Sequence, residues 1–141
     1  MTDDTRRARN LETANRLLAL MGQMDVEQML EHYADDVVVE LPYAPGGMPK
    51  VHAGKDAAIA FMREAKNFFS SYTSEVDAVY PAADDPDTVL AEVRGHGVAA
   101  PTGRPYEQTY VLVLRFAPDG KLRLWREYYD PGVVIKAFGN A

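Results

Sequence analysis

The order of the hydrophobic patterns along the chain constrains its fold most strongly, because helical patterns fill the first half and strand patterns fill the second. Apolar residues recur at the i, i+3, i+4, i+7 spacing of an amphipathic helix over residues 5–21 and again over residues 56–69. A short helix is predicted directly after Asp25, because this carboxylate can accept hydrogen bonds from the free N–H groups of a first helical turn. The sequence therefore predicts three helices before the main group of strands.

The second half of the chain has the composition of a β-sheet. Four runs rich in β-branched and aromatic residues, separated by turn sequences, predict strands at residues 71–80, 88–98, 106–116 and 121–129. An earlier run, DVVVEL, predicts one more strand at residues 36–41, and Pro131 favours a short terminal helix. This order favours an α+β fold, in which a curved, mixed or antiparallel sheet packs its concave face on three helices from the N-terminal half.

Size and charge exclude several classes of protein. With 141 residues, of which 47% are apolar, we expect residues 1–141 to form one domain. The absence of cysteine excludes disulfides and thiolate metal sites. A net charge of −6 disfavours nucleic acid and anionic membrane surfaces as partners, and no apolar run approaches the roughly 20 residues of a membrane span. We therefore expect a cytoplasmic protein.

The common cofactor and catalytic motifs are missing or lack their structural context. His32, His52 and His96 are far apart, so no metal site is predicted, and His52 is interpreted as a loop residue that makes a hydrogen bond. There is no GxSxG nucleophile motif and no GxxxxGK[ST] phosphate loop. Residues 95–100, GHGVAA, match a dinucleotide fingerprint in letters only, because a strand rather than a helix follows them. We expect no metal and no cofactor.

Glu127 is the strongest candidate for a catalytic group. The alternation of side chains along a strand predicts that one side of the last strand carries Arg123, Trp125, Glu127 and Tyr129. An acid beside Trp and Tyr in a mostly apolar strand either pairs with a base, such as Arg126 or Arg94, or lines a cavity. In a cavity, burial against Trp125 would raise the carboxyl pKa and suit Glu127 to general acid/base catalysis.

Weaker candidates are Glu40 and three tyrosines. Glu40 lies in VVVELP and is better explained as a solvent-facing strand residue. Tyr43, Tyr106 and Tyr110 could offer hydroxyl groups to a ligand, although each also fits the plain role of an aromatic side chain packed on a sheet.

Three segments resemble a known superfamily in their order and spacing. They are HYADDVVVELP, VHAGKDAAIAF and LVLRFAPDGKLRLWREYYDP. Across nearly the whole chain they resemble the nuclear transport factor two-like superfamily, which includes SnoaL-like proteins, ketosteroid isomerase and limonene epoxide hydrolase. The resemblance implies a cystatin-like cone, in which a strongly curved sheet encloses a deep pocket and a convex face is used for dimerisation. The fold hosts many functions, so each branch needs its own residues.

Two enzymatic branches of the superfamily lack their catalytic groups in this chain. At the positions that resemble those of the catalytic base, the oxyanion tyrosine and the protonated aspartate of ketosteroid isomerase, this chain has Leu41, Leu17 and Leu112. Where limonene epoxide hydrolase has its arginine and aspartate, this chain has Val93 and Gly95. Only the third member of that triad has a counterpart, which is Glu127.

The nearest pattern is that of the PhzA/PhzB-type phenazine biosynthesis proteins of the SnoaL-like group. The segments REYYDPGVVIKAFG and EVRGHG resemble the terminal segment and one strand of that branch. By this resemblance Glu127 occupies the place of the catalytic acid, whereas Phe61 stands where the branch has a pocket histidine. This departure leaves open whether Glu127 serves another substrate or the fold.

Two functional hypotheses follow. In the first, the chain is an acid/base isomerase, cyclase or condensing enzyme for a cyclic or polyketide-like carbonyl compound, with Glu127 as its catalytic group. In the second, it is a non-catalytic ligand-binding or assembly module of the same fold. In both, a neutral, apolar cavity is expected to be lined by Leu17, Leu41, Tyr43, Phe61, Tyr110, Leu112 and Trp125.

A homodimer is also predicted. Residues 106–116 carry apolar side chains at both alternating sets of positions, so both faces of this strand need a cover. The helices cover one face, and a second copy of the chain is the expected cover of the other.

Overall fold

The computed structural model describes residues 1–139 and begins with a long helix, α1 (Asp3–Gly22). The helix starts two residues before the predicted range because Thr2 caps it, with its hydroxyl accepting a hydrogen bond from the N–H of Thr5 at 3.1 Å. The next helix, α2 (Val26–Leu30), is capped as expected by Asp25, which accepts from the N–H of Gln28 at 3.2 Å. Local capping therefore fixes the start of both helices.

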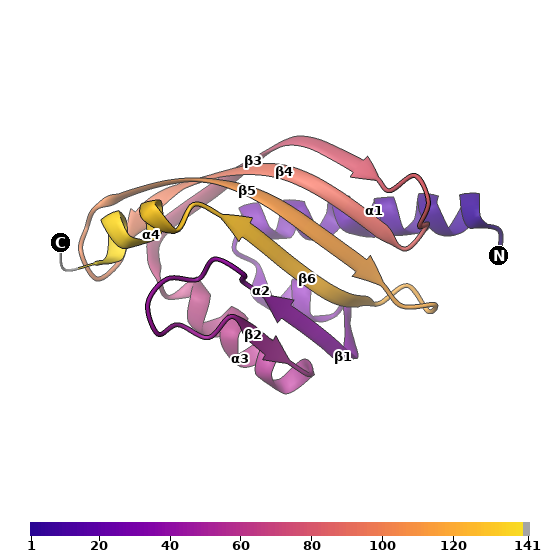
Figure 1. Cartoon of the computed structure of the whole chain (residues 1–141), viewed down its shortest axis with the longest axis horizontal. Helices are drawn as coiled ribbons and strands as arrows, with labels where there is room; N and C mark the ends of the chain where they lie inside the picture. Colours follow the sequence, from indigo (N-terminus) through magenta and orange to yellow (C-terminus); the bar gives the residue numbers. More distant parts are fainter. Residues whose placement is uncertain (140–141) are drawn as a thin grey trace.

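Six strands form one sheet, and their order and curvature are visible in Figure 1. Their order across the sheet is β2-β1-β6-β5-β4-β3, with β1 parallel to β6 and every other neighbouring pair antiparallel. The bounds are β1 (Tyr33–Glu40), β2 (Val51–Ala53), β3 (Phe69–Pro81), β4 (Thr88–Ala99), β5 (Pro105–Phe116) and β6 (Leu122–Tyr129). The predicted α+β class with a mixed sheet is confirmed.

One of the remaining elements was not predicted, and the others differ from the predicted ones only at their ends. Strand β2 was not predicted, because three residues between Pro/Gly-rich and helical segments give no periodic signal. Helix α3 (Lys55–Lys66) ends before the predicted residue 69, because Phe69 already pairs with Ala99 in the sheet. Helix α4 (Pro131–Phe138) begins at the predicted proline and is capped by Asp130.

The helices cover the concave face of the sheet in two separate places. Helix α1 packs against β3 and β4, whereas α3 packs against β1 and β2 at the other side. On β5 the inward side chains are buried, among them Leu112 and Leu114 with no exposed surface. Within residues 1–139, no helix has both the length and the apolar composition that a membrane crossing requires.

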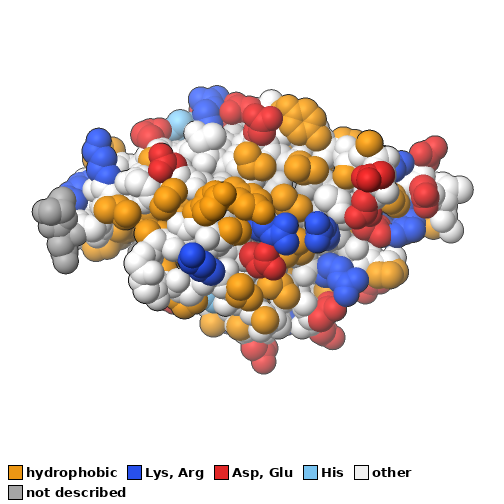
Figure 2. Space-filling view, in the orientation of Figure 1, with side chains coloured by type: hydrophobic (Ala, Val, Ile, Leu, Met, Phe, Trp, Pro, Cys, Tyr) orange, Lys and Arg blue, Asp and Glu red, His pale blue; other side chains and the backbone are white. Residues whose placement is uncertain are grey.

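The outer face of the sheet carries apolar and charged side chains together. Figure 2 shows an apolar band near the middle of this face, bordered by basic and acidic groups. Val111 on β5 is 40% exposed there, and its partners across the sheet are Glu92 and Tyr128. The predicted cover of this face by a second copy stays a prediction.

The predicted alternation along β6 is wrong at Arg123. Phe116 pairs with Leu122 and Arg115 with Leu124, so Arg123 is an extra residue in a register shift. Its guanidinium donates to Asp36 on the solvent side at 3.1 Å, rather than sharing a side with Glu127. A single inserted residue reverses the side of the sheet on which the neighbouring side chains lie, and an alternating sequence pattern does not show such an insertion.

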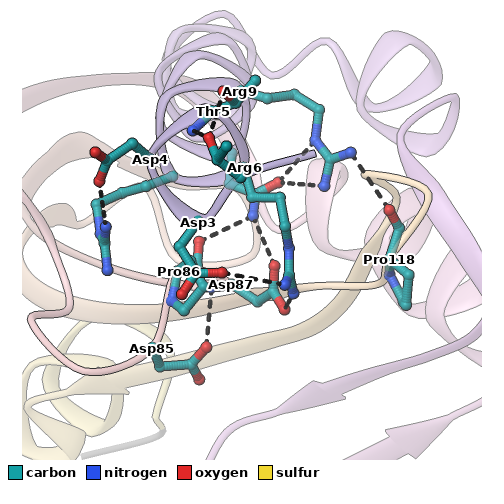
Figure 3. Close-up of polar contacts among 12 residues, drawn as sticks. Asp3, Asp4, Thr5, Arg6, Arg9, Asp85, Pro86, Asp87 and Pro118 are labelled. Atoms are coloured by element: carbon teal, nitrogen blue, oxygen red, sulfur yellow. Dashed lines mark hydrogen bonds and ion pairs between the residues drawn. The ribbon is translucent and has the colours of Figure 1, made fainter.

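A buried polar cluster fixes α1 to the turn between β3 and β4 (Figure 3). Asn10 has no exposed surface, and its amide donates to the carbonyl of Pro86 and to the carboxylate of Asp87, both at 3.0 Å. Arg6 also donates to Asp87, and Arg9 donates to the carbonyl oxygen of the Asn10 side chain at 3.2 Å. These bonds set the position of α1 along the strands that it covers.

We predict that Asn10→Ala lowers the free energy of unfolding by about 1–3 kcal/mol, because it leaves buried acceptors without a donor. Asn15→Ala is the matched control, since Asn15 is an exposed asparagine of the same helix. Denaturant unfolding of both variants beside the parent measures the difference. Equal stability of the two variants would contradict a fixing role for Asn10.

Candidate functional site

A cavity of about 350 Å³ lies between the concave face of the sheet and the helices. It opens where the two helical covers leave the inner faces of β5 and β6 free, and α4 contributes to its edge through Val134 and Phe138. Most of its lining is apolar or aromatic, as is common for small-molecule sites. Among the described residues that line it, Glu127 is the one carboxylate, and no lysine, arginine or histidine takes part.

The sheet supplies one wall of the cavity. Because alternate residues of a strand share a face, neighbouring strands bring their inward side chains together. These wall residues are Tyr72, Tyr106, Tyr110, Trp125, Glu127 and Tyr129. They include every hydroxyl and carboxyl group of the described lining.

The helices and loops supply the opposite wall and the mouth, with no hydroxyl or charged group among the described residues. Helix α3 contributes Phe61, Met62 and Ala65, and the loop after β1 contributes Leu41 and Met48. The segment from the end of α1 through α2 adds Met21, Met24, Val26 and Met29. The cavity is therefore polar on its sheet side alone.

Glu127 lines this cavity and has no basic partner among the described residues. The indole N–H of Trp125 donates to its carboxylate at 3.2 Å. Burial raises the pKa of Glu127 from 4.5 to about 7, although the Trp125 hydrogen bond acts in the opposite direction. Near neutral pH both the protonated and the ionised form of Glu127 are therefore populated.

The two arginines considered as partners of Glu127 bind other acids on the outer face. Arg126 donates to Glu40 at 2.7 Å, and Arg94 donates to Asp77 at 2.9 Å and to Glu75 at 2.7 Å. Of the two alternatives for Glu127, the structure thus has the acid in the cavity rather than in an ion pair. Glu40 is also explained by its bond to Arg126.

Three tyrosine hydroxyls form a hydrogen-bonded chain in the cavity wall. Tyr72 donates to Tyr110 at 3.2 Å, and the hydroxyls of Tyr106 and Tyr110 are 2.8 Å apart. Burial raises the pKa of all three hydroxyls well above the ordinary value, and the nearby carboxylate of Glu127 adds to this effect. The three groups therefore remain protonated donors at neutral pH.

Gly95 makes the approach of these tyrosines possible. A Cβ at this position would lie 2.6 Å from the hydroxyl of Tyr72 and 2.8 Å from a ring carbon of Tyr110. The glycine of the GHG segment is therefore explained by close packing against rings and not by a nucleotide.

The predicted site residues separate into two groups. Leu41, Phe61, Tyr110 and Trp125 line the cavity together with Glu127. The others are outside the described lining: Leu17 and Leu112 lie in the closed core with no exposed surface, and Tyr43 is 54% exposed beside Tyr128. Tyr43 follows the end of β1 and lies in the Pro/Gly-rich loop, outside the regular alternation of the strand.

His52 differs from its predicted role. It lies in β2 and stacks on Phe61, with ring centroids 4.2 Å apart, and its Nε2 is buried with no hydrogen-bond partner among the described residues. Across residues 1–139, no three His, Asp or Glu side chains are grouped so that they could hold a metal ion.

Sequence reasoning missed Tyr72 and the methionines of the cavity. Tyr72 lies on the edge strand β3, and only the pairing of Tyr72 with Gly97 shows which face it occupies. The methionines come from segments that are distant in sequence, so no local pattern signals that they meet.

Comparison with known sequences gives one consistent result. A family model described as a SnoaL-like domain matches residues 14–136. The YesE protein of Bacillus subtilis, described as uncharacterised, is 36% identical over 92% of this chain and 87% of its own length. An uncharacterised PhzA/B-like protein of Pseudomonas aeruginosa is 31% identical over 87% of this chain and 85% of its own length.

Solved structures have the same fold. A Bacillus subtilis protein described as a candidate isomerase is 34% identical, with a TM-score of 0.81 over 100% of this chain and 98% of that one. A phenazine biosynthesis-related protein of Pseudomonas aeruginosa, 24% identical, has a TM-score of 0.82 over 96% and 88%. The Mycobacterium tuberculosis protein Rv0760c, bound to estradiol-17β-hemisuccinate and 22% identical, has a TM-score of 0.72 over 89% and 96%.

We predict that Glu127→Gln becomes more stable than the parent as the pH rises. The folded parent holds the Glu127 proton up to about pH 7, whereas an ordinary glutamate loses it near 4.5. Between these pH values the glutamate is ionised in the unfolded parent and still protonated in the folded parent. The folded parent therefore loses stability relative to the unfolded chain as the pH rises through this window. The advantage of the variant should grow by about 2–3 kcal/mol between about pH 5 and pH 8.

Thermal or denaturant unfolding at the two pH values measures this difference, and Glu12→Gln on the exposed face of α1 is the control. A variant that is less stable than the parent at both pH values would show that Glu127 has a charged structural partner.

Proposed function

The chain belongs to the SnoaL-like family of the nuclear transport factor two-like superfamily, as its motifs predicted, and on that premise we propose an acid/base function for it. In this proposal the protein binds a neutral, cyclic carbonyl compound in its cavity and moves a proton on it through Glu127. The reaction class is isomerisation, cyclisation or condensation through an enol or enolate. No cofactor takes part in the proposed step.

The position of Glu127 carries this proposal. A single carboxyl group, without a basic partner in the described lining and with a pKa raised by burial to about 7, is populated in both protonation states at neutral pH. That balance suits a general acid/base catalyst, because the same group must take up a proton and return it. An apolar lining also favours a substrate without charge.

The tyrosine chain supports a carbonyl group as the polar part of the substrate. Three hydroxyls have three protons, and the two hydrogen bonds that join Tyr72, Tyr110 and Tyr106 use two of them. One O–H of Tyr106 or Tyr110 is left over within the chain of hydroxyls. This donor can bind a carbonyl oxygen and stabilise the negative charge that develops on it.

The proposed step conserves atoms and electrons. The carboxylate of Glu127 takes the proton from a carbon next to the carbonyl group, and the electron pair of that C–H bond moves into the enolate. A tyrosine O–H donates to the enolate oxygen without transferring its proton. Glu127 then returns its proton to the same carbon or to another carbon of the conjugated system, which completes an isomerisation.

The named neighbours are compatible with such a ligand. The mycobacterial neighbour holds estradiol-17β-hemisuccinate, whose steroid part is polycyclic and largely apolar and whose succinyl end carries a carboxyl group, and a Bacillus subtilis neighbour is described as a candidate isomerase. The second hypothesis, binding without catalysis, is favoured by Leu17, Leu41 and Leu112, which stand where ketosteroid isomerase has catalytic groups. The exchange experiment below separates the two.

We propose in addition that the protein forms a homodimer through the outer face of its sheet. The apolar part of this face includes Leu90, Val111, Val113 and Tyr128, and Val111 is 40% exposed in one copy. Burial of such a surface against a second copy is favourable, and charged groups beside it can pair across the interface. The proposed location of this dimer is the cytoplasm.

We predict that the parent catalyses hydrogen exchange on a cyclic ketone. The probe is 2-tetralone, a neutral bicyclic ketone with acidic hydrogens next to its carbonyl group, incubated in D₂O and followed by proton NMR. Glu127→Gln should lower the catalysed exchange rate by about 10²–10⁴-fold, because an amide cannot accept the proton. Tyr110→Phe, which interrupts both tyrosine hydrogen bonds, should lower it by about 100-fold.

Glu12→Gln serves as the control for this experiment and should exchange at the parent rate. If the parent binds 2-tetralone but exchanges its hydrogens no faster than Glu127→Gln, the non-catalytic hypothesis is favoured.

We predict that Val111→Arg produces a monomer. Light scattering after size exclusion should give twice 15.7 kDa for the parent and 15.7 kDa for the variant, because a buried unpaired guanidinium opposes association. Val76→Arg is the matched control, since Val76 on the edge strand β3 is similarly exposed at 43% but lies outside the proposed interface. A parent that is monomeric at micromolar concentration would contradict the proposed dimer.

A further inference from the structure

The methionines of this chain are gathered at the cavity. The chain has six methionines, and the lining includes Met21, Met24, Met29, Met48 and Met62. The sixth, Met1, is 77% exposed and lies outside the described lining. The five come from the end of α1, the turn after it, α2, the loop after β1, and α3. They lie in the wall that faces the tyrosines and Glu127, together with other apolar side chains.

These methionines differ in how far a reagent in water can reach them. Met48 is 37% exposed, and Met24 and Met62 are partly exposed, and we call these three the mouth methionines because water reaches them. Met21 and Met29 are 8% and 1% exposed and lie deeper. The chain has no cysteine, so no thiolate within it competes for an oxidant that attacks sulfur.

We propose that Met24, Met48 and Met62 form an oxidative modification site whose conversion to sulfoxide weakens the binding of apolar ligands. The inference rests on the proposed function only in that the cavity binds an apolar molecule. The oxidant is hydrogen peroxide or an organic peroxide. One peroxide oxygen is transferred to the sulfur, which loses two electrons, and water or an alcohol is released as the O–O bond breaks.

The position of the mouth explains why such a change matters. A sulfoxide oxygen is a strong acceptor, and in the free protein water can bind it at the mouth. A bound apolar ligand removes that water, and the described lining on this side has no O–H or N–H side chain to replace it, because the tyrosines lie on the sheet. An acceptor buried without a donor opposes binding.

The same geometry leaves the fold intact. The three mouth side chains keep contact with water when the cavity is empty, so their sulfoxides remain solvated in the folded protein. Met29 lies in the deep part of the lining and is 1% exposed, so a sulfoxide there would disturb packing, and this low exposure slows its reaction. Mild oxidation therefore changes ligand binding before it changes stability.

The test uses Nile red, a neutral polycyclic fluorescent dye, as the ligand. The dye is titrated into the full chain before and after limited treatment with hydrogen peroxide, and peptide mass spectrometry locates each added oxygen. We expect oxygen on Met24, Met48 and Met62 before Met21 and Met29, and binding weaker by about tenfold or more. Treatment with methionine sulfoxide reductases should restore the affinity.

A protection experiment on the unchanged sequence gives a second readout. Saturating Nile red should slow the oxidation of the three mouth methionines, whereas Met1 should react at the same rate with or without the dye, since it lies outside the described lining.

A variant with Met24→Leu, Met48→Leu and Met62→Leu is the matched control, and its affinity for Nile red before peroxide treatment is the reference. We expect peroxide to change that affinity by less than about twofold, because leucine carries no sulfur.

Three outcomes overturn the proposal, and they are distinguishable. Unchanged Nile red affinity after complete conversion of the mouth methionines contradicts the modification site alone. Equal slowing of Met1 and the mouth methionines by the dye contradicts their position at the ligand. If the untreated chain does not bind Nile red, the binding step of the proposed function fails, and this inference fails with it.

Discussion

The cavity exists because three helices cover two separate parts of the concave face of one curved sheet. Helix α1 is fixed over β3 and β4 by the buried bonds of Asn10, and α3 lies over β1 and β2. The inner faces of β5 and β6 lie between these two covers, and they present Tyr110, Trp125 and Glu127 to an open space. The gap between the two helical covers thus creates the cavity, and the side chains of the strands supply its polar groups.

The distribution of charge follows from this arrangement. On the outer face Arg126, Arg94 and Arg123 each bind an acid, and water screens these pairs. On the inner face Glu127 meets the indole N–H of Trp125 and no basic side chain in the described lining. Burial therefore raises the pKa of Glu127 without a nearby positive charge to offset it, because these arginines lie on the opposite side of the same sheet.

The two walls of the cavity supply different properties. The sheet wall carries rigid rings and protonated hydroxyls that hold a fixed pattern of donors, with Gly95 leaving room for Tyr72 and Tyr110. The helical wall carries flexible thioethers, a side-chain type that adapts its shape readily. In the proposed function the strands would orient the ligand and the helices would adapt to its outline.

The sequence by itself determined the α+β class, the helix capped by Asp25 and the four long strands, and it singled out Glu127 as a candidate, because hydrophobic period and local capping act over short distances. It also indicated Leu41, Phe61, Tyr110 and Trp125 as lining residues. Only the tertiary structure decided the features that depend on distant partners. It places Glu127 in the cavity and away from the arginines, and it encloses Leu17 and Leu112 in the core. It also turns Arg123 outward through the register shift in β6. The meeting of five methionines was also settled there, since three separated segments of the chain come together only after the helices dock on the sheet.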